Sequence, residues 1–211
     1  MSAAEWVPDQ ADVAALRTAA AGCAGCELHG PATQTVFSAG NPRAPLMLVG
    51  EQPGDVEDRE GIPFVGPAGR LLQEAVDEAG IERTRLYVTN AVKHFRFELR
   101  GRRRIHQTPQ IRHLKACRPW LSAEIAAVAP DLIVCLGAIA AKTLLGNDFR
   151  LTQDRGRLID AEVDGRPRRL IATAHPSAVL RTPAGTERDE AYAALVADLR
   201  TAAAALEQSS D

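Results

Sequence analysis

The chain has 211 residues, 45% of them hydrophobic, and its 25 Lys and Arg against 27 Asp and Glu give a formal net charge of −2. This length supports a sizeable core without disulfide bonds, and the near-neutral charge excludes a protein that coats nucleic acid or membranes through overall charge. Because the longest apolar stretch is too short for a bilayer span and the N-terminus lacks the basic residues of a signal peptide, we expect one cytoplasmic, monomeric domain over residues 1–211, without a membrane partner. In that compartment we expect the four cysteines to bind a metal, to take part in redox chemistry or to pack in the core.

Strands and helices are predicted to alternate along the chain. An Ala-rich helix over residues 12–21 lies within an N-terminal segment, residues 1–45. Short apolar runs predict strands, and helical spacing of apolar residues predicts the helices between them, with strands at 46–50, 86–92, 131–136 and 169–173 and helices at 66–79, 108–129, 137–145 and 186–206. The alternation predicts an α/β three-layer sandwich with a central, mainly parallel four-stranded sheet flanked by helices, whose ligands bind at the carboxyl ends of the strands.

Positive charge is concentrated in one segment. Residues 93–118 contain nine Lys and Arg against Glu98 alone, a net charge of +8, which leaves −10 for the rest of the chain. A solvated basic loop and helix face would give this pattern, and so would a surface that binds phosphates.

Polar residues follow the first predicted strand. Gly50 is followed by Glu51, Asp55 and Asp58, whose carboxylates all fall within eight residues. Carboxylates this close together raise some of their pKa values or recruit cations, as in acid/base sites, although a turn of solvated acids is the plain alternative.

The ends of two later strands are also polar. Asn90 ends the second strand with an amide that can both donate and accept hydrogen bonds, and His175 follows the last strand. A lone histidine in such a place is more often structural. Because carboxyl ends of parallel strands meet at one edge, the three polar strand ends together predict a site there.

Taken in order, the motifs of residues 23 to about 181 resemble those of the iron-sulfur branch of the uracil-DNA glycosylase superfamily. The match comprises Cys-x-x-Cys at 23–26, Gly-Glu-x-Pro-Gly at 50–54, Gly-x-Pro-Phe-Val-Gly at 61–66, Tyr-Val-Thr-Asn-Ala-Val-Lys at 87–93, Ala-Cys-Arg-Pro-Trp-Leu at 116–121 and His-Pro-Ser at 175–177. Within the branch, Gln52 and the run Arg-Arg-Arg-Ile-His at 102–106 resemble the UdgX type, whose members stay covalently attached to the DNA from which they cut uracil.

The resemblance implies a role for each motif. Phe64 would stack on a flipped uracil, Asn90 would read its edge, and His175 would bind a carbonyl oxygen as charge develops on the leaving base. His106 would attack C1′ of the sugar while Glu51 orients it. The implied residues are, for catalysis, His106, Glu51, His175, Gln52 and Asp55; for substrate, Phe64, Asn90, Asp58, Gly50 and Arg104; for DNA, Lys93, Arg102, Arg103, Ser177 and Arg181.

Two other functions fit parts of the same pattern. One is a hydrolytic uracil-DNA glycosylase that turns over freely, with Glu51 activating water; the other is a metal-stabilised nucleic-acid binder without catalysis. The plain alternative for His106 is an exposed or phosphate-contacting loop residue, and the plain alternative for Phe64 is core filling. A P-loop nucleotidase is excluded because no Gly-Lys-Ser/Thr follows the glycine loops.

The resemblance also implies a 4Fe-4S cluster. The matching ligands are Cys23, Cys26 and Cys117, with His94 where the family has its other cysteine, whereas Cys135 lies in a continuous apolar strand and is expected in the core. Three cysteines and a histidine would also hold zinc, and spacing does not separate the metals. The expected role of the cluster is structural, and the expected partners are uracil-containing DNA and the product uracil.

Overall fold

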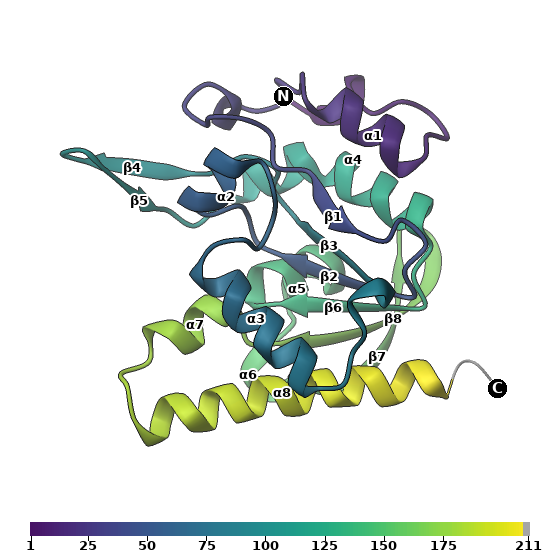
Figure 1. Cartoon of the computed structure of the whole chain (residues 1–211). Coiled ribbons are helices and arrows are strands. Elements are labelled where there is room, and N and C mark those ends of the chain that lie inside the picture. Colours follow the sequence, from purple (N-terminus) through teal and green to yellow (C-terminus); the bar gives the residue numbers. More distant parts are fainter. Residues whose placement is uncertain (209–211) are drawn as a thin grey trace.

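A computed structural model describes residues 1–208, which form a mixed six-stranded sheet covered by helices on both faces (Figure 1). The strand order is β1-β3-β2-β6-β8-β7. The four inner strands are parallel and β1 and β7 are antiparallel edges. The strands are β1 (Ser38–Gly40), β2 (Leu46–Gly50), β3 (Leu86–Asn90), β6 (Leu132–Leu136), β7 (Leu158–Val163) and β8 (Arg166–Thr173).

Alternate side chains of the inner strands pack against different helices. Leu46 and Leu48 face the layer that contains α3 and α8, and Met47 and Val49 face the layer that contains α4 and α5. Both faces are therefore apolar, as continuous hydrophobic strands require. The longer helices are α3 (Pro67–Glu78), α4 (Ile111–Val128), α5 (Ala138–Leu145) and α8 (Thr186–Glu207); the shorter ones are α1 (Val13–Ala20), α2 (Asp55–Glu60), α6 (Leu151–Asp154) and α7 (Pro176–Arg181), with 3-10 turns at Ala3–Glu5, Glu27–His29 and Arg83–Arg85.

The predicted fold class is confirmed, but the predicted strand count of four is wrong. The two additional strands lie at the edges of the sheet, where they are hard to recognise from the sequence. β1 is three residues long and ends in glycine, and β7 alternates exposed and half-buried residues before Val163. Neither edge strand carries the continuous apolar run that marks the inner strands.

The basic segment contains a hairpin that the sequence analysis did not predict. β4 (Phe97–Arg100) pairs with β5 (Arg103–His106), and the hairpin projects from the body of the molecule (Figure 1). Gly101 adopts a φ of 61° in the tight turn, a conformation that glycine adopts without strain. The pairing places Phe97 opposite His106 at the base of the hairpin.

Helix α4 begins later than predicted, at Ile111 rather than at Thr108. Gln110 is its N-cap, and the backbone N–H of Gln110 donates to Nδ1 of His113 at 3.0 Å. The residues before Gln110 are consequently free to connect the hairpin to the helix.

The N-terminal segment packs on the outer side of α4. Leu16 and Ala20 of α1 join Trp120 of α4 in a separate apolar cluster, which also contains three of the four cysteines. No helix within residues 1–208 has both the length and the apolar character needed to cross a membrane. That residues 1–211 act as a single domain stays a prediction.

Candidate active site

A cavity of about 670 Å³ opens at the carboxyl ends of the inner strands. Glu51 follows β2, Asn90 ends β3 and His175 follows β8, and all three line the cavity together with Phe64 and His106. The structure therefore brings together the three polar strand ends, the aromatic residue and the hairpin histidine.

Glu51 and His106 face each other in this cavity. Oε1 of Glu51 lies 3.7 Å from Nε2 of His106, and this buried oxygen has no hydrogen-bond partner among the described residues. Burial raises the pKa of Glu51 to about 7, against the lowering effect of Arg181. Burial also lowers the pKa of His106, with smaller contributions from Arg181 and Arg96. At neutral pH the pair thus combines a neutral imidazole with a carboxyl group that is close to its titration midpoint.

Phe64 and Asn90 form one wall of the cavity. Phe64 has a φ of 57°, which is strained for an aromatic residue, and its ring is stacked near that of His175, with centroids 6.3 Å apart and 29° between the planes. Oδ1 of Asn90 is buried and has no hydrogen-bond partner among the described residues. A planar heterocycle in this place can stack on the aromatic ring and donate a hydrogen bond to the amide oxygen.

Gly50 allows these two side chains to come together. A Cβ at position 50 would lie 2.3 Å from Oδ1 of Asn90 and 2.6 Å from Cζ of Phe64. Both distances are too short for a nonbonded contact, so the Asn90 amide or the Phe64 ring would have to move. The absence of a side chain at Gly50 is therefore part of the pocket itself.

We expect Gly50→Ala to weaken substrate binding by roughly 10-fold or more, because either the amide or the ring must move out of the pocket. The concentration of enzyme that gives half the maximal single-turnover rate measures this effect. Gly30→Ala is the matched control, since a Cβ there meets only a carbonyl oxygen at 3.7 Å. Equal behaviour of the two variants would contradict the role given to Gly50.

The hydrogen bonds of His175 determine its tautomer. Nδ1 accepts the backbone N–H of Ser177 at 3.1 Å and lies 2.8 Å from the Ser177 hydroxyl oxygen, to which Arg181 donates. A backbone N–H can only donate, so Nδ1 is unprotonated and Nε2 carries the proton. Burial lowers the pKa of His175 to about 4. The residue is consequently a neutral N–H donor at physiological pH.

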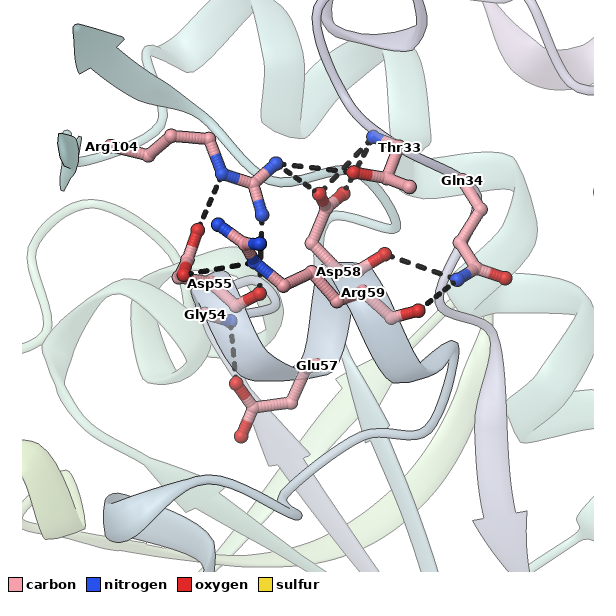
Figure 2. Close-up of polar contacts among 8 residues, drawn as sticks. All are labelled: Thr33, Gln34, Gly54, Asp55, Glu57, Asp58, Arg59 and Arg104. Atoms are coloured by element: carbon pink, nitrogen blue, oxygen red, sulfur yellow. Dashed lines mark hydrogen bonds and ion pairs between the residues drawn. The ribbon is translucent and has the colours of Figure 1, made fainter. Parts of the chain in front are cut away.

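Arg104 joins the hairpin to α2, as Figure 2 shows. Its guanidinium binds Asp55 through Nε and Asp58 through Nη1 at 2.6 Å, and Nη1 also donates to the hydroxyl of Thr33 at 3.1 Å. Two aromatic rings, those of Phe95 and Phe97, lie within 5.5 Å of the guanidinium carbon. We refer to this set, Arg104 with Asp55, Asp58, Thr33, Phe95 and Phe97, as the arginine clamp.

The arginine clamp lies beside the cavity and does not line it. Asp58 is fully buried, and neither it nor Asp55 or Arg104 belongs to the lining. Because Arg104 lies two residues before His106 in β5, the contacts that the structure shows favour a role of the clamp in positioning the histidine. The catalytic role expected for Asp55 and the substrate contacts expected for Asp58 and Arg104 stay predictions.

Gln52 lines the cavity, and backbone groups occupy its amide. The amide donates to the backbone oxygens of Arg96 and Gln107 and accepts the backbone N–H of Arg96. Arg96 and Gln107 pair with each other at the base of the hairpin, so these hydrogen bonds hold the hairpin base next to the cavity. They give Gln52 a positioning role beside His106, and its catalytic role stays a prediction.

The structure also reveals Glu57, which the sequence analysis did not single out. Its carboxylate accepts the backbone N–H groups of Gly54 at 3.1 Å and Gly66 at 2.8 Å (Figure 2 shows the first), which ties together the two loops that carry Glu51 and Phe64. A glutamate three residues after the N-cap Gly54 is a sequence signal of such a cap.

The residues predicted to contact DNA lie in different environments. Arg102 and Arg103 are exposed on the hairpin, and Ser177 and Arg181 line the cavity. Lys93 is not at the surface with them, because it is fully buried and forms an ion pair with Glu124. A nonpolar run, Ala91 and Val92, precedes Lys93, and that was the only sequence signal of its burial.

Three cysteines are buried side by side between the N-terminal segment and α4. Cys23, Cys26 and Cys117 belong to one apolar cluster and form no disulfide, whereas Cys135 lies in the sheet core, as predicted. The Trp120 indole donates to Sγ of Cys23 at 3.2 Å, and the backbone N–H of Lys93 donates to Sγ of Cys117 at 3.3 Å. Within residues 1–208 no three His, Cys, Asp or Glu side chains converge on a single metal ion, which a four-iron cluster does not require because each of its ligands binds a different iron.

His94 lies next to Lys93 in the buried segment after β3. Its Nε2 and the hydroxyl of Thr35 are 2.9 Å apart, and burial lowers its pKa to about 4. A histidine that uses Nε2 in this way has Nδ1 left for another partner, which is the usual arrangement of metal-ligating histidines.

The chain is similar to known proteins over most of its length. The model of the uracil DNA glycosylase superfamily matches residues 37–200. Proteins named type-4 uracil-DNA glycosylase are similar to the chain: that of Thermotoga maritima is 39% identical over 160 residues (75% of this chain and 78% of the relative), and that of Archaeoglobus fulgidus is 35% identical over 165 residues (76% and 79%). The protein of the same name from Pyrobaculum aerophilum is 36% identical over 166 residues, 77% of this chain and 81% of its own.

Proposed function

The chain belongs to the uracil-DNA glycosylase superfamily and is a uracil-DNA glycosylase, and we propose that after excision it retains the abasic sugar in a covalent bond to His106. The observation that carries this proposal is the half-exposed imidazole of His106, 3.7 Å from Glu51 inside the cavity that also contains Phe64, Asn90 and His175.

Recognition of the base follows from the cavity wall. The Phe64 ring stacks on the uracil face, and the Asn90 amide, whose Oδ1 has no protein partner among the described residues, binds the uracil edge. His175 donates its Nε2–H to a uracil carbonyl oxygen. As the bond between C1′ and N1 breaks, both bonding electrons leave with uracil, and this hydrogen bond stabilises the resulting anion.

The covalent step begins once C1′ has become electron-deficient. The unprotonated ring nitrogen of His106 donates its lone pair to C1′, so that one C–N bond forms in place of the one that broke. Ionised Glu51 stabilises the cationic sugar and accepts the proton from the imidazolium. The product lacks a good leaving group and therefore persists.

Three features of the site support capture by His106 over attack by water. Its lowered pKa keeps the imidazole neutral and nucleophilic at neutral pH. The arginine clamp holds β5, and Gln52 holds the base of the same hairpin. Such positioning is worth several orders of magnitude in effective concentration.

Incubation with an oligonucleotide that contains one deoxyuridine tests the function directly. We expect free uracil in solution and a heat-stable protein–DNA band on a denaturing gel. Free uracil with an alkali-labile abasic site and no such band would identify the hydrolytic alternative, with Glu51 activating water. Salt-sensitive binding without uracil release would identify a non-catalytic binder.

The rate of capture should depend on pH through Glu51. Because the pKa of Glu51 is about 7, its ionised fraction rises as pH increases through 7, whereas His106 is already neutral there. We expect the maximal single-turnover rate of adduct formation to increase roughly 10-fold between pH 6 and 8, following one ionisation. Glu51→Gln should be slower and lose this dependence; an unchanged profile in that variant would assign the ionisation to another group.

We further propose that Cys23, Cys26, Cys117 and His94 hold a 4Fe-4S cluster, with zinc as the alternative. Support comes from the donor set, which consists of three buried thiols without a disulfide and a histidine with Nδ1 available. The group would cross-link the N-terminal segment to α4 and supply no chemistry at the sugar. Visible absorption near 400 nm that Cys117→Ala removes would support iron, and a colourless, zinc-containing protein would support zinc.

A further inference from the structure

A second groove, of about 470 Å³, lies between α4 and α5 beside the active-site cavity. Ile111 and Leu114 of α4 line one side, and Ile139 of α5 lines the other. Lys115 and Lys142 also line the groove, one from each helix. The groove thus combines apolar surface with ammonium groups.

The charges of the groove are available to a ligand. Arg118, the other cation of the lining, is held by Asp164 at 2.8 Å and by the backbone oxygen of Thr143 at 3.2 Å. No carboxylate within residues 1–208 lies at ion-pair distance from Lys115 or Lys142. Two lysines without an acidic partner, on facing helices, attract a phosphate more strongly than either would alone.

The two lysines contrast with most of the basic segment. Of its nine cations, five have carboxylate partners: Lys93, Arg100, Arg104, Arg112 and Arg118. Much of the +8 charge is therefore used within the protein. Outside the hairpin and its base, Lys115 is the one cation of the segment for which the described residues provide no carboxylate.

The groove is continuous with the active-site cavity. Ile139 lines both, and the neighbouring residues Thr108 and Pro109 line the cavity and the groove respectively. α5 begins at the cavity with Ala138 and continues along the groove to Lys142 and Thr143. A DNA strand that leaves the cavity past Ile139 enters the groove that the two lysines line.

We propose that this groove binds the nucleotides on one side of the flipped uridine in the same DNA strand. Lys115 and Lys142 bind a flanking phosphate, and the sugar and base rest on Ile111, whose surface is 64% exposed, and on Ile139. The inference rests on the proposed glycosylase function and adds a directional subsite to it. The affinity of the enzyme for single-stranded DNA should depend on whether the strand extends on the 5′ or the 3′ side of the uridine.

Single-stranded oligonucleotides of three designs test this subsite. The first has two nucleotides on each side of the deoxyuridine, and the others extend it by four nucleotides on the 5′ side or on the 3′ side only. Fluorescence anisotropy gives the affinity, and single-turnover uracil release gives the maximal rate. We expect only one of the two extensions to tighten binding, by about 10-fold.

Lys115→Ala/Lys142→Ala should abolish that gain and leave the maximal rate unchanged. It should also lower the salt dependence for the favoured extension, by about 0.7 in slope for each phosphate that the protein no longer neutralises. Ile111→Ser should reduce the gain by about 3-fold without changing the salt slope. The matched control is Arg43→Ala/Arg85→Ala, which removes the same charge. These two arginines precede β2 and β3 and so lie at the amino ends of the strands, away from the cavity at the carboxyl ends.

The results separate this inference from the glycosylase proposal. A gain from the favoured extension that survives the lysine substitutions, an equal gain from both extensions, or an equal loss in the control variant would overturn the groove as a subsite. Failure of the wild-type protein to release uracil would overturn the glycosylase function instead. The two outcomes are distinguishable, because anisotropy measures binding without uracil release and would still show whether the gain from one extension requires the two lysines.

Discussion

His106→Ala releases uracil but forms no covalent protein–DNA band: this is the result we expect when the variant is incubated with a uracil-containing oligonucleotide. The adduct yield should fall by at least about 1000-fold, because alanine offers no lone pair to C1′. Uracil release should continue, since Phe64, Asn90 and His175 remain in place. Without the imidazole, water has access to the sugar, and Glu51 is positioned to activate it.

Arg100→Ala is the matched control for this result. Arg100 lies in the same hairpin as His106, and its side chain is 69% exposed. This variant should form the adduct at the wild-type rate. A heat-stable band that persists in His106→Ala would show that another nucleophile traps the sugar, and Glu51→Gln added to that variant would then show whether the bond is an ester of Glu51.

The sequence was sufficient to predict the part of the site that the sheet builds. Continuous apolar runs mark buried strands. In a parallel sheet the carboxyl ends of these strands lie next to one another, so polar side chains that follow different strands come close together. Glu51, Asn90 and His175 therefore belong together on topological grounds, and all three line the same cavity. The core role of Cys135 followed from its apolar neighbours in the same way.

What the sequence did not reveal depends on pairing across long stretches of chain. The arginine clamp joins Arg104 to Asp55, Asp58 and Thr33, and no local pattern indicates that this arginine binds carboxylates while Arg102 and Arg103 stay exposed. The burial of Lys93 was missed for the same reason, because its partner Glu124 lies in α4. Charge counted along a sequence does not show which charges neutralise one another.

His175→Ala should lower the maximal rate of uracil release by roughly 100- to 1000-fold, the second of the large effects that the site predicts. The neutral Nε2–H is oriented before substrate binds, because Ser177 fixes Nδ1 as an acceptor. Loss of one such donor to a developing anion costs about 3 to 4 kcal/mol of transition-state stabilisation. Since the pKa of His175 is about 4, the loss should be the same at every pH between about 6 and 8.

A change of leaving group distinguishes anion stabilisation from mere packing. An electron-withdrawing substituent, as in 5-fluorouracil, makes the departing base a more stable anion that depends less on the hydrogen bond from His175. The rate deficit of His175→Ala should consequently shrink with 5-fluorouracil-containing DNA, while half-saturating enzyme concentrations change little. Ser177→Ala, which keeps the imidazole and the backbone N–H but removes the hydroxyl, should show a smaller deficit of about 10-fold. A deficit in His175→Ala that is identical for both bases would mean that the ring only supports Phe64, against which it stacks, and that the negative charge is stabilised elsewhere.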